Sequence, residues 1–436
     1  MGATLGKNLA PGVSRREVFS WAMYDFANSG YTTVVITAVF NAYFVAAVAG
    51  GAPWATFAWT CALAVSYVLI IVSAPVVGAY ADARAAKKRL LLLTTVGCVA
   101  FTAGLALVAP GDLWLAAVLV VLSNFFFGTG ENLIAAFLPE LAREDALGRV
   151  SGWGWSLGYL GGLTSLAACM GWVIHAQARG AAAAEFVPAT MLITAGIFAA
   201  ASAPTFLFLR ERARPSAVGV PLKSAFVRVA QTLRRAHRYA DLSRFLVCLV
   251  FYQAGIQTIV ALAAVYAQEV MGFTTRDTLF LVLVVNTTAA AGAFAFGQVQ
   301  DRLGHVATIA LTLLGWLATI FLVWLAEGIA AFWIAANLVG ICLGSSQSAG
   351  RALVGYLSPP ARAGEFFGLW GLAVKLSSIL GPITYGAVTW MTAGNHRLAV
   401  LVTGIYFVIG LLIVATLDVA RGRRAALEGE PSIPER

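Results

Sequence analysis

Long apolar segments alternate with short polar ones along almost the whole chain. An α-helix needs about 20 predominantly apolar residues to cross a bilayer. Segments of this kind begin near twelve positions: Phe19, Ala55, Leu90, Leu113, Val150, Val187, Ser243, Thr278, His305, Ile329, Glu365 and Arg397. The pattern predicts an all-α polytopic membrane protein with twelve transmembrane helices, and an even number of spans places both termini on one side.

The longest polar stretch, residues 210–243, divides the predicted spans six and six. We therefore expect an N-terminal six-helix bundle over residues 1–209, a cytoplasmic linker over 210–243, a C-terminal six-helix bundle over 244–419 and a flexible cytoplasmic tail over 420–436. In the linker, apolar residues share one helical face and basic residues lie mostly off it: Leu222, Phe226, Val229 and Leu233 against Lys223, Arg228, Arg234, Arg235 and Arg238. The pattern predicts an amphipathic helix on anionic lipids of the inner leaflet, although a linker without any regulatory role would look the same.

Short motifs recur at a nearly constant offset in the two predicted halves. Asp82 in GAYAD and Asp301 in GQVQDRLG lie 219 residues apart. Further matches lie at offsets of 219 or 216, namely Leu138 with Leu357, Gly148 with Gly364 and Gly152 with Gly368. The offsets between the matching motifs differ by no more than three residues. This near-constant offset indicates a tandem duplication of a six-span unit.

The amino-acid composition is typical of a membrane protein. Of the 436 residues, 60% are hydrophobic and 11% are charged, and the mean hydropathy is +0.83, whereas soluble domains carry about 25% charged residues. The five cysteines stand singly, without the spacing of a metal site or a redox pair. We therefore expect no metal and no bound cofactor.

The net charge of +9 is explained by orientation rather than by nucleic acid. When the termini are assigned to the cytoplasm, most of the 29 Lys and Arg residues fall on the inner side, as the positive-inside rule requires. We therefore expect a multi-pass protein of the bacterial inner membrane, with both termini cytoplasmic and no nucleic-acid partner.

Four ionisable residues interrupt the apolar spans: Asp25, Glu131, Arg351 and Lys375. Counting from the nearest flanking arginine at about 1.5 Å per residue places all four near the bilayer midplane. A charge there costs about 2.5 to 3.5 kcal/mol on insertion scales and marks function by default. Either carboxylate would serve as a proton carrier and Arg351 as a clamp for a substrate carboxylate. The alternative is a set of permanent ion pairs, with Arg351 on Glu131, that only hold the halves together.

Amide side chains in the same spans complete the predicted substrate and proton cavity. It comprises Asp25, Asn28, Glu131, Asn132, Gln253, Gln257, Gln347, Arg351 and Lys375. Amides orient polar ligands by hydrogen bonds, but they also join neighbouring helices, so both roles stay open for each of them.

Six plus six spans, a long central loop and G-x-x-x-D after the second and eighth spans resemble the major facilitator superfamily. Gly297, Asp301, Arg302 and Gly304 fit its loop motif, while in the first copy Gly78 and Asp82 fit but alanines replace the Arg and the later Gly. Glycine lets two helices touch, and the aspartate can face a helix N-terminus or pair with an arginine. Gly78, Asp82, Gly297, Asp301 and Arg302 are therefore predicted to be conformational latches, not substrate ligands.

Longer segments narrow the resemblance to the vacuole-effluxer (autophagy-related) branch of that superfamily, as a bacterial-type member. They include WAMYDFANSGYTTVVITAVFNAYF, AAFLPELAREDALGRVSGWGWSLGYLGGL and RAGEFFGLWGLAVKLSSILGPITYG, and they lie in both halves. The resemblance implies amino acid efflux and a cavity lined by the first, fourth, seventh and tenth spans, with the eleventh peripheral. After Tyr252 the family pattern leads us to expect an acidic or amide pair, where this chain has Gln253 and Ala254.

These patterns favour a monomeric secondary transporter that moves a small polar metabolite by alternating access, coupled to the proton gradient. A passive facilitator, or a carrier of peptides or organic anions, would also need a polar cavity. A transporter-shaped receptor or scaffold would not need the midplane charges. An enzyme would need a nucleophile, a metal set or a carboxylate pair at a membrane face, and the sequence contains no such constellation.

Overall fold

The computed structural model describes residues 8–213, 222–234, 236–325 and 328–428. Within this part of the chain, twelve helical segments are long and apolar enough to cross a membrane, which confirms the predicted fold class. The N half contains α2 (Arg15–Tyr31), η2 (Thr32–Ala38), α3 (Phe40–Tyr43), η3 (Phe44–Val48), α4 (Ala55–Arg84), α5 (Lys87–Gly104), η4 (Leu105–Leu107), α6 (Leu113–Ala135), α7 (Leu138–Leu141), η5 (Glu144–Ala146), α8 (Leu147–Ala178) and α9 (Ala183–Phe208).

The C half repeats this six-span plan. It contains α11 (Ala240–Glu269), α12 (Thr275–Leu303), α13 (His305–Leu325), α14 (Ile329–Leu357), η7 (Pro360–Arg362), α15 (Ala363–Met391) and α16 (His396–Val414). Between the halves lie α10 (Leu222–Arg234) and η6 (Ala236–Tyr239), and α17 (Val419–Glu428) follows the last span. The predicted and observed starts of the spans agree to within a few residues, because the apolar length needed to cross a bilayer sets them both.

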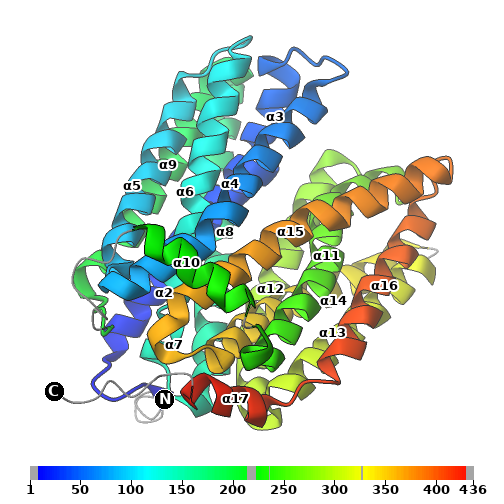
Figure 1. The fold of residues 1–436 in the computed structure, drawn as a ribbon. Coiled ribbons are helices and arrows are strands. Elements are labelled where there is room, and N and C mark those ends of the chain that lie inside the picture. The colour runs from blue at the N-terminus through cyan, green and yellow to red at the C-terminus, as the bar shows by residue number, and fades with distance from the viewer. Residues whose placement is uncertain (1–7, 214–221, 235, 326–327, 429–436) are drawn as a thin grey trace.

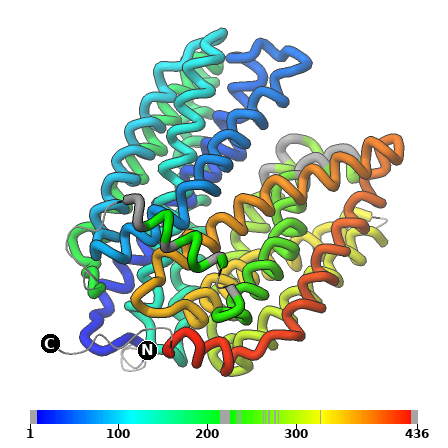
Figure 2. Tube along the Cα trace, viewed as in Figure 1, coloured from blue at the N-terminus to red at the C-terminus, as the bar shows by residue number. Residues whose placement is uncertain are grey.

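The two halves lie together at one end of the molecule and diverge toward the other (Figures 1 and 2). We call these the contact end and the splayed end. Helices α7, α10 and α17 lie at the contact end (Figure 1). Each half has a hydrophobic core of its own, built around Trp21 and Phe127 in the N half and around Phe245 and Trp316 in the C half.

Two pairs of helices make the most extensive contacts between the halves, α4 with α15 and α8 with α12, and α8 also contacts α14 while α6 contacts α15. Glycines allow the close approach, since a Cβ at Gly78 would lie 2.0 Å from the carbonyl oxygen of Gly364, and one at Gly297 would lie 2.6 Å from that of Gly148. The two contacts are equivalent under the repeat, which explains why the same glycine pattern recurs in both halves.

The first span is not one continuous α-helix. Beyond Tyr31 it widens into η2, where the amide of Val39 donates to the carbonyl of Val34, five residues back. A run of β-branched residues from Thr32 to Thr37 crowds α-helical turns, and the Thr33 hydroxyl donates to the backbone of Ser29, a contact that tends to bend helices. Widened turns of this kind are frequent at functional sites.

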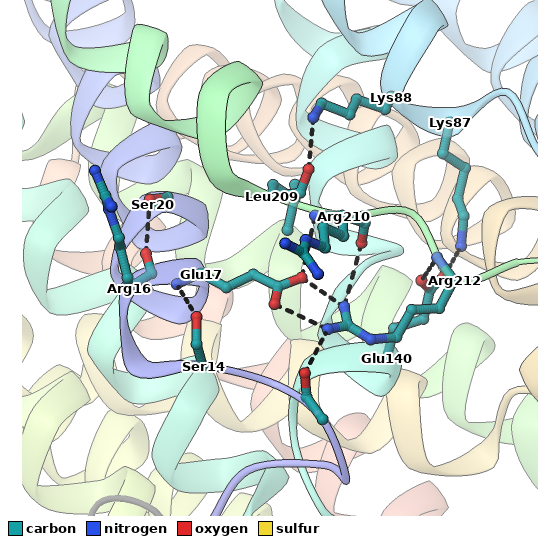
Figure 3. Close-up of polar contacts among 11 residues, drawn as sticks. Ser14, Arg16, Glu17, Ser20, Lys87, Lys88, Glu140, Leu209, Arg210 and Arg212 are labelled. Atoms are coloured by element: carbon teal, nitrogen blue, oxygen red, sulfur yellow. Dashed lines mark hydrogen bonds and ion pairs between the residues drawn. The ribbon is translucent and has the colours of Figure 1, made fainter.

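The start of the linker is tied to the N half by a polar network at the contact end (Figure 3). Arg212 donates to both carboxylate oxygens of Glu17, at 2.5 and 2.8 Å, and its backbone amide donates to Glu140. Glu140 also forms an ion pair with Lys87. The hydrogen bond with Glu17 raises the pKa of Arg212 above its ordinary value, so the Arg212 side chain stays charged at physiological pH.

The linker helix α10 packs on protein along part of one face. Val229 and Ala225 contact Val76 and Ala79 of α4, while Phe226 is 52% exposed. The side chains of Leu222, Lys223, Arg228, Leu233 and Arg235 lie outside the described residues. The binding of anionic lipids by this helix stays a prediction.

Candidate functional site

Asp25 of α2 and Arg351 of α14 form an ion pair between the halves. Arg351 Nη1 donates to Asp25 Oδ2 at 2.7 Å, and the two side chains are 3% and 11% exposed for Arg351 and Asp25 respectively. Breaking such a buried pair by removing one partner is strongly unfavourable, because it leaves an uncompensated charge. The contact therefore holds the two halves together in the conformation observed.

The rest of the Arg351 guanidinium is also held by the N half. Nε donates to Ser151 Oγ at 3.1 Å, and Nη2 donates to the Ser151 carbonyl oxygen at 2.9 Å. The guanidinium carbon lies 4.9 Å from the ring centre of Trp21 and 5.3 Å from that of Trp155. Arginine is suited to such a site, because its planar fork makes several directed hydrogen bonds and stacks on aromatic faces.

A second ion pair between the halves joins Lys375 of α15 to Glu131 of α6. The Nζ of Lys375 lies 3.4 Å from Glu131 Oε2 and 5.6 Å from the ring centres of Tyr67 and Phe127. The Lys375 and Glu131 side chains are 9% and 22% exposed, so this pair is more open to solvent than the first. The four intramembrane charges thus form two separate pairs, and Arg351 does not pair with Glu131.

The predicted amides divide into bonded and unbonded groups. In the C half, Gln253 Nε2 donates to Gln347 Oε1 at 2.7 Å and the reverse bond is 3.3 Å, so the pair joins α11 to α14. Gln257 lies one turn farther along α11 and is partly buried. Among the described residues, Asn28 Oδ1 and both side-chain polar atoms of Asn132 are buried without a hydrogen-bond partner.

Asn132 faces the other half directly. A Cβ on Gly371 of α15 would lie 2.2 Å from both Nδ2 and Oδ1 of Asn132. Gly371 precedes Lys375 by one helical turn, and Asn132 follows Glu131. The unbonded amide and the second ion pair therefore belong to the same contact between α6 and α15.

The predicted latch residues lie at the contact end and bridge the halves. Asp82 accepts hydrogen bonds at 2.9 Å from the backbone amides of Gly364 and Glu365, at the start of α15. A carboxylate is favourable there because the first amides of a helix are unbonded and carry partial positive charge.

Asp301 makes the equivalent contact on the other side of the repeat. It accepts from the amides of Gly148 and Arg149 at 3.0 and 3.2 Å, at the start of α8, and Arg149 Nε lies 3.4 Å from its carboxylate. Arg302 is exposed, and the basic side chain in contact with the Asp301 carboxylate is that of Arg149.

The aromatic residues of both ion-pair sites are absent from the cavity predicted from the sequence. A signal was available, because Trp21 and Phe127 each precede the carboxylate of their site by four residues on the same helix. Residues four apart share a helical face. Tyr67, Ser151 and Trp155 come from other helices and have no comparable local signal.

A family model described as "Vacuole effluxer Atg22 like" matches residues 54–148 and 146–427, which together make up most of the chain. The chain belongs to the vacuole effluxer Atg22-like family. Its bacterial relative YxiO of Bacillus subtilis, described as an uncharacterized MFS-type transporter, is 28% identical over 408 residues, which cover 91% of this chain and 93% of YxiO.

A fungal relative extends the comparison of this Atg22-like chain. Autophagy-related protein 22 of Candida glabrata is 29% identical over 218 residues, covering 48% of this chain and 40% of that protein. The chain therefore matches less than half of the length of the fungal protein.

Solved structures show the major facilitator fold of the Atg22-like chain. The human organic anion transporter MFSD10 aligns with a TM-score of 0.73 at 15% identity, covering 92% of this chain and 99% of that one. The transporter FucP in the outward conformation aligns with a TM-score of 0.69 at 15% identity, covering 92% and 97%. These relatives and neighbours are transporters and not enzymes, and the chain is a membrane transporter with this fold.

Proposed function

We propose that this chain is a secondary transporter that carries a small polar metabolite by alternating access and couples the movement to protons. The observation that supports this most directly is the pair of intramembrane ion pairs, Asp25–Arg351 and Glu131–Lys375, each of which joins one half to the other. Charges buried in a membrane protein are expensive. Ion pairs that join the two bundles have to break and form again whenever the bundles move relative to each other.

The proposed orientation of the protein in the membrane rests on its charge distribution. We propose that the contact end faces the cytoplasm, because basic residues gather in the segments at that end. The observed conformation is then closed toward the cytoplasm by the Asp82 and Asp301 latches. Protonation of Asp25 neutralises its carboxylate, weakens its attraction for Arg351 and allows the halves to separate at the contact end.

Amino acids are the substrates to test first. Family membership and the mixed charges of the site both favour a compound with acidic and basic groups, since carboxylates and cations are available side by side. In this scheme the Asn28, Asn132, Gln253, Gln257 and Gln347 amides orient the substrate, and the residues of both ion pairs bind its charged groups. The protein works as a monomer in the bacterial inner membrane, with both termini cytoplasmic.

The deciding experiment is uptake of a labelled amino acid mixture into proteoliposomes that contain the purified protein, with and without an imposed pH gradient. Stimulation of uptake by the gradient, and its loss when a protonophore is added, is the expected result. Uptake that is indifferent to the gradient would replace the proposal with a passive facilitator. Uptake no greater than that of empty liposomes would remove the amino acid assignment.

A further inference from the structure

The described contacts of the Lys375 ammonium group are made to residues of the N half. Glu131 supplies a carboxylate oxygen 3.4 Å from Nζ, and Tyr67 and Phe127 place their ring centres 5.6 Å from it. A carboxylate with two aromatic faces is a general recognition pattern for organic cations, because the negative faces of the rings and the carboxylate both attract positive charge. Lys375 is the only part of this cluster that belongs to the C half.

The residues around the Lys375 ammonium group are held in place by contacts within the N half. Phe127 stacks on Tyr31 with the ring centres 4.9 Å apart. The helix that carries Tyr67 is joined to α6 by a hydrogen bond of 2.5 Å from Asn124 Nδ2 to Ser66 Oγ. Because these contacts lie inside one packed bundle, the site keeps its shape when the halves separate and Lys375 leaves with the C half.

Lys375 is also the less firmly held of the two intramembrane cations. Its single carboxylate contact is 3.4 Å long and the Glu131 side chain is 22% exposed. Arg351, by contrast, has a 2.7 Å contact with Asp25 and two hydrogen bonds to Ser151. A cation that arrives from the aqueous side therefore displaces Lys375 in preference to Arg351.

We propose that Glu131, Tyr67 and Phe127 form the binding site for an ammonium group of the transported substrate, and that Lys375 occupies this site when substrate is absent. The inference rests on the proposed transport function, because it assigns one part of the same site. It restricts the substrate to small organic compounds with an amino group. When displaced, Lys375 carries a free positive charge that an anionic group of the same substrate would neutralise.

The test is a binding measurement that does not depend on transport. The probes are n-butylammonium, butyrate and 1-butanol, which have the same chain length and differ in charge, and binding to protein in lipid nanodiscs is followed by isothermal titration calorimetry. Lys375→Met removes the resident cation and keeps the side-chain length. It is expected to bind n-butylammonium about tenfold more tightly than the wild type, which corresponds to about 1.4 kcal/mol. Affinities for butyrate and 1-butanol should not rise.

Two further variants define the site. Adding Glu131→Gln to Lys375→Met should return n-butylammonium affinity to the wild-type value or below it, whereas Lys375→Arg retains a cation and should not show the tenfold gain. Equal affinity of wild type and Lys375→Met for n-butylammonium, or an equal gain for butyrate, would overturn the inference. If Lys375→Met does not fold, Tyr67→Leu serves instead. It should weaken n-butylammonium binding by about threefold, as the loss of one cation–π contact predicts, and an unchanged affinity would overturn the inference.

The inference and the proposed function fail in different ways. Selective ammonium binding that depends on Glu131, together with proteoliposomes that transport nothing, would keep the ammonium site and overturn the transport proposal. Gradient-stimulated amino acid uptake without any selective binding of n-butylammonium to Lys375→Met would keep the transport proposal and overturn the ammonium site.

Discussion

The Asp25 carboxylate and the Arg351 guanidinium lie 2.7 Å apart, although 326 residues separate them in the sequence. The pair connects the first span, in the N half, to the tenth span, in the C half. Ser151 and two tryptophans of the N half surround the guanidinium. Every polar contact of Arg351 described above is therefore made to the opposite half. The pair therefore holds the two halves together, and in the proposed transport cycle it has to separate.

Removing one member of this pair should destabilise the protein more than removing both. Asp25→Ala and Arg351→Ala each leave a buried charge without its partner, which costs about 3 to 5 kcal/mol, whereas the double variant leaves none. The melting temperature of the detergent-solubilised protein should therefore fall most in the single variants. Additive losses in the double variant would show that the two side chains act independently.

Asp25→Asn should remove the dependence of transport on the pH gradient. Asparagine keeps the size and one oxygen acceptor for Arg351 but cannot take up a proton at physiological pH. The measurement is initial uptake into proteoliposomes at several external pH values, with Asp112→Asn as the control, because Asp112 is an exposed carboxylate in a loop. A variant that retains the full pH response would exclude Asp25 as the proton carrier.

Gly78→Ala should open the contact end. The new Cβ would lie 2.0 Å from the carbonyl oxygen of Gly364, so α4 and α15 must separate. Spin labels at Ala109, in the loop between η4 and α6, and at Met391, the last residue of α15, should then come closer together as the halves rock. The distances are measured by double electron–electron resonance in a background where the exposed Cys61 is replaced by serine.

The matched control is Gly171→Ala, because a Cβ at this helical glycine would meet nothing within 4 Å. Replacing a helical glycine by alanine at an open position favours the helix by about 0.5 to 1 kcal/mol. Gly171→Ala should therefore keep the wild-type label distances and an equal or higher melting temperature. Matching distance changes in both variants would mean that the α4–α15 approach does not determine the conformation.

Asn132→Leu should separate stability from transport. Both polar atoms of the Asn132 side chain are buried without a partner among the described residues, so an apolar side chain of similar size should leave the melting temperature unchanged or raise it, with a gain of about 1 kcal/mol. Transport should be lost if the amide binds substrate when the halves separate. Asn337→Leu is the control, because the Asn337 amide already donates to the Trp333 carbonyl within its own helix.

The fold could be predicted from the sequence, but the pairing of the four intramembrane charges could not. Counting residues along a helix gives depth, since each residue adds a fixed rise. It does not give the rotation of each helix about its axis, which depends on how all the helices pack. The sequence thus left Arg351 free to pair with Glu131 and treated the span of Lys375 as peripheral, whereas packing places Arg351 on Asp25 and Lys375 on Glu131.

The residues predicted to be latches show the opposite case. The repeat offset identified Gly78, Asp82, Gly297 and Asp301 because a close helix approach requires glycine wherever it recurs, and the same geometry is used twice. The basic partner of Asp301 does not follow from the repeat. Arg302 stands next to it in the motif, but Arg149 of the opposite half carries the charge contact, and contacts across halves leave no local pattern.

The widened turns of the first span have a mechanical consequence. Each hydrogen-bonded turn of η2 encloses one residue more than an α-helical turn, because the amide bonds to the carbonyl five residues back instead of four. The span beyond Tyr31 therefore contains one more residue than a continuous α-helix would need. Conversion of one such turn to α geometry would rotate the helix beyond it by about 100° while every backbone amide finds a new partner. The part of this span toward the splayed end can therefore rotate about the helix axis independently of the part that carries Asp25. Because Asp25 precedes η2, its contact with Arg351 is kept during this rotation.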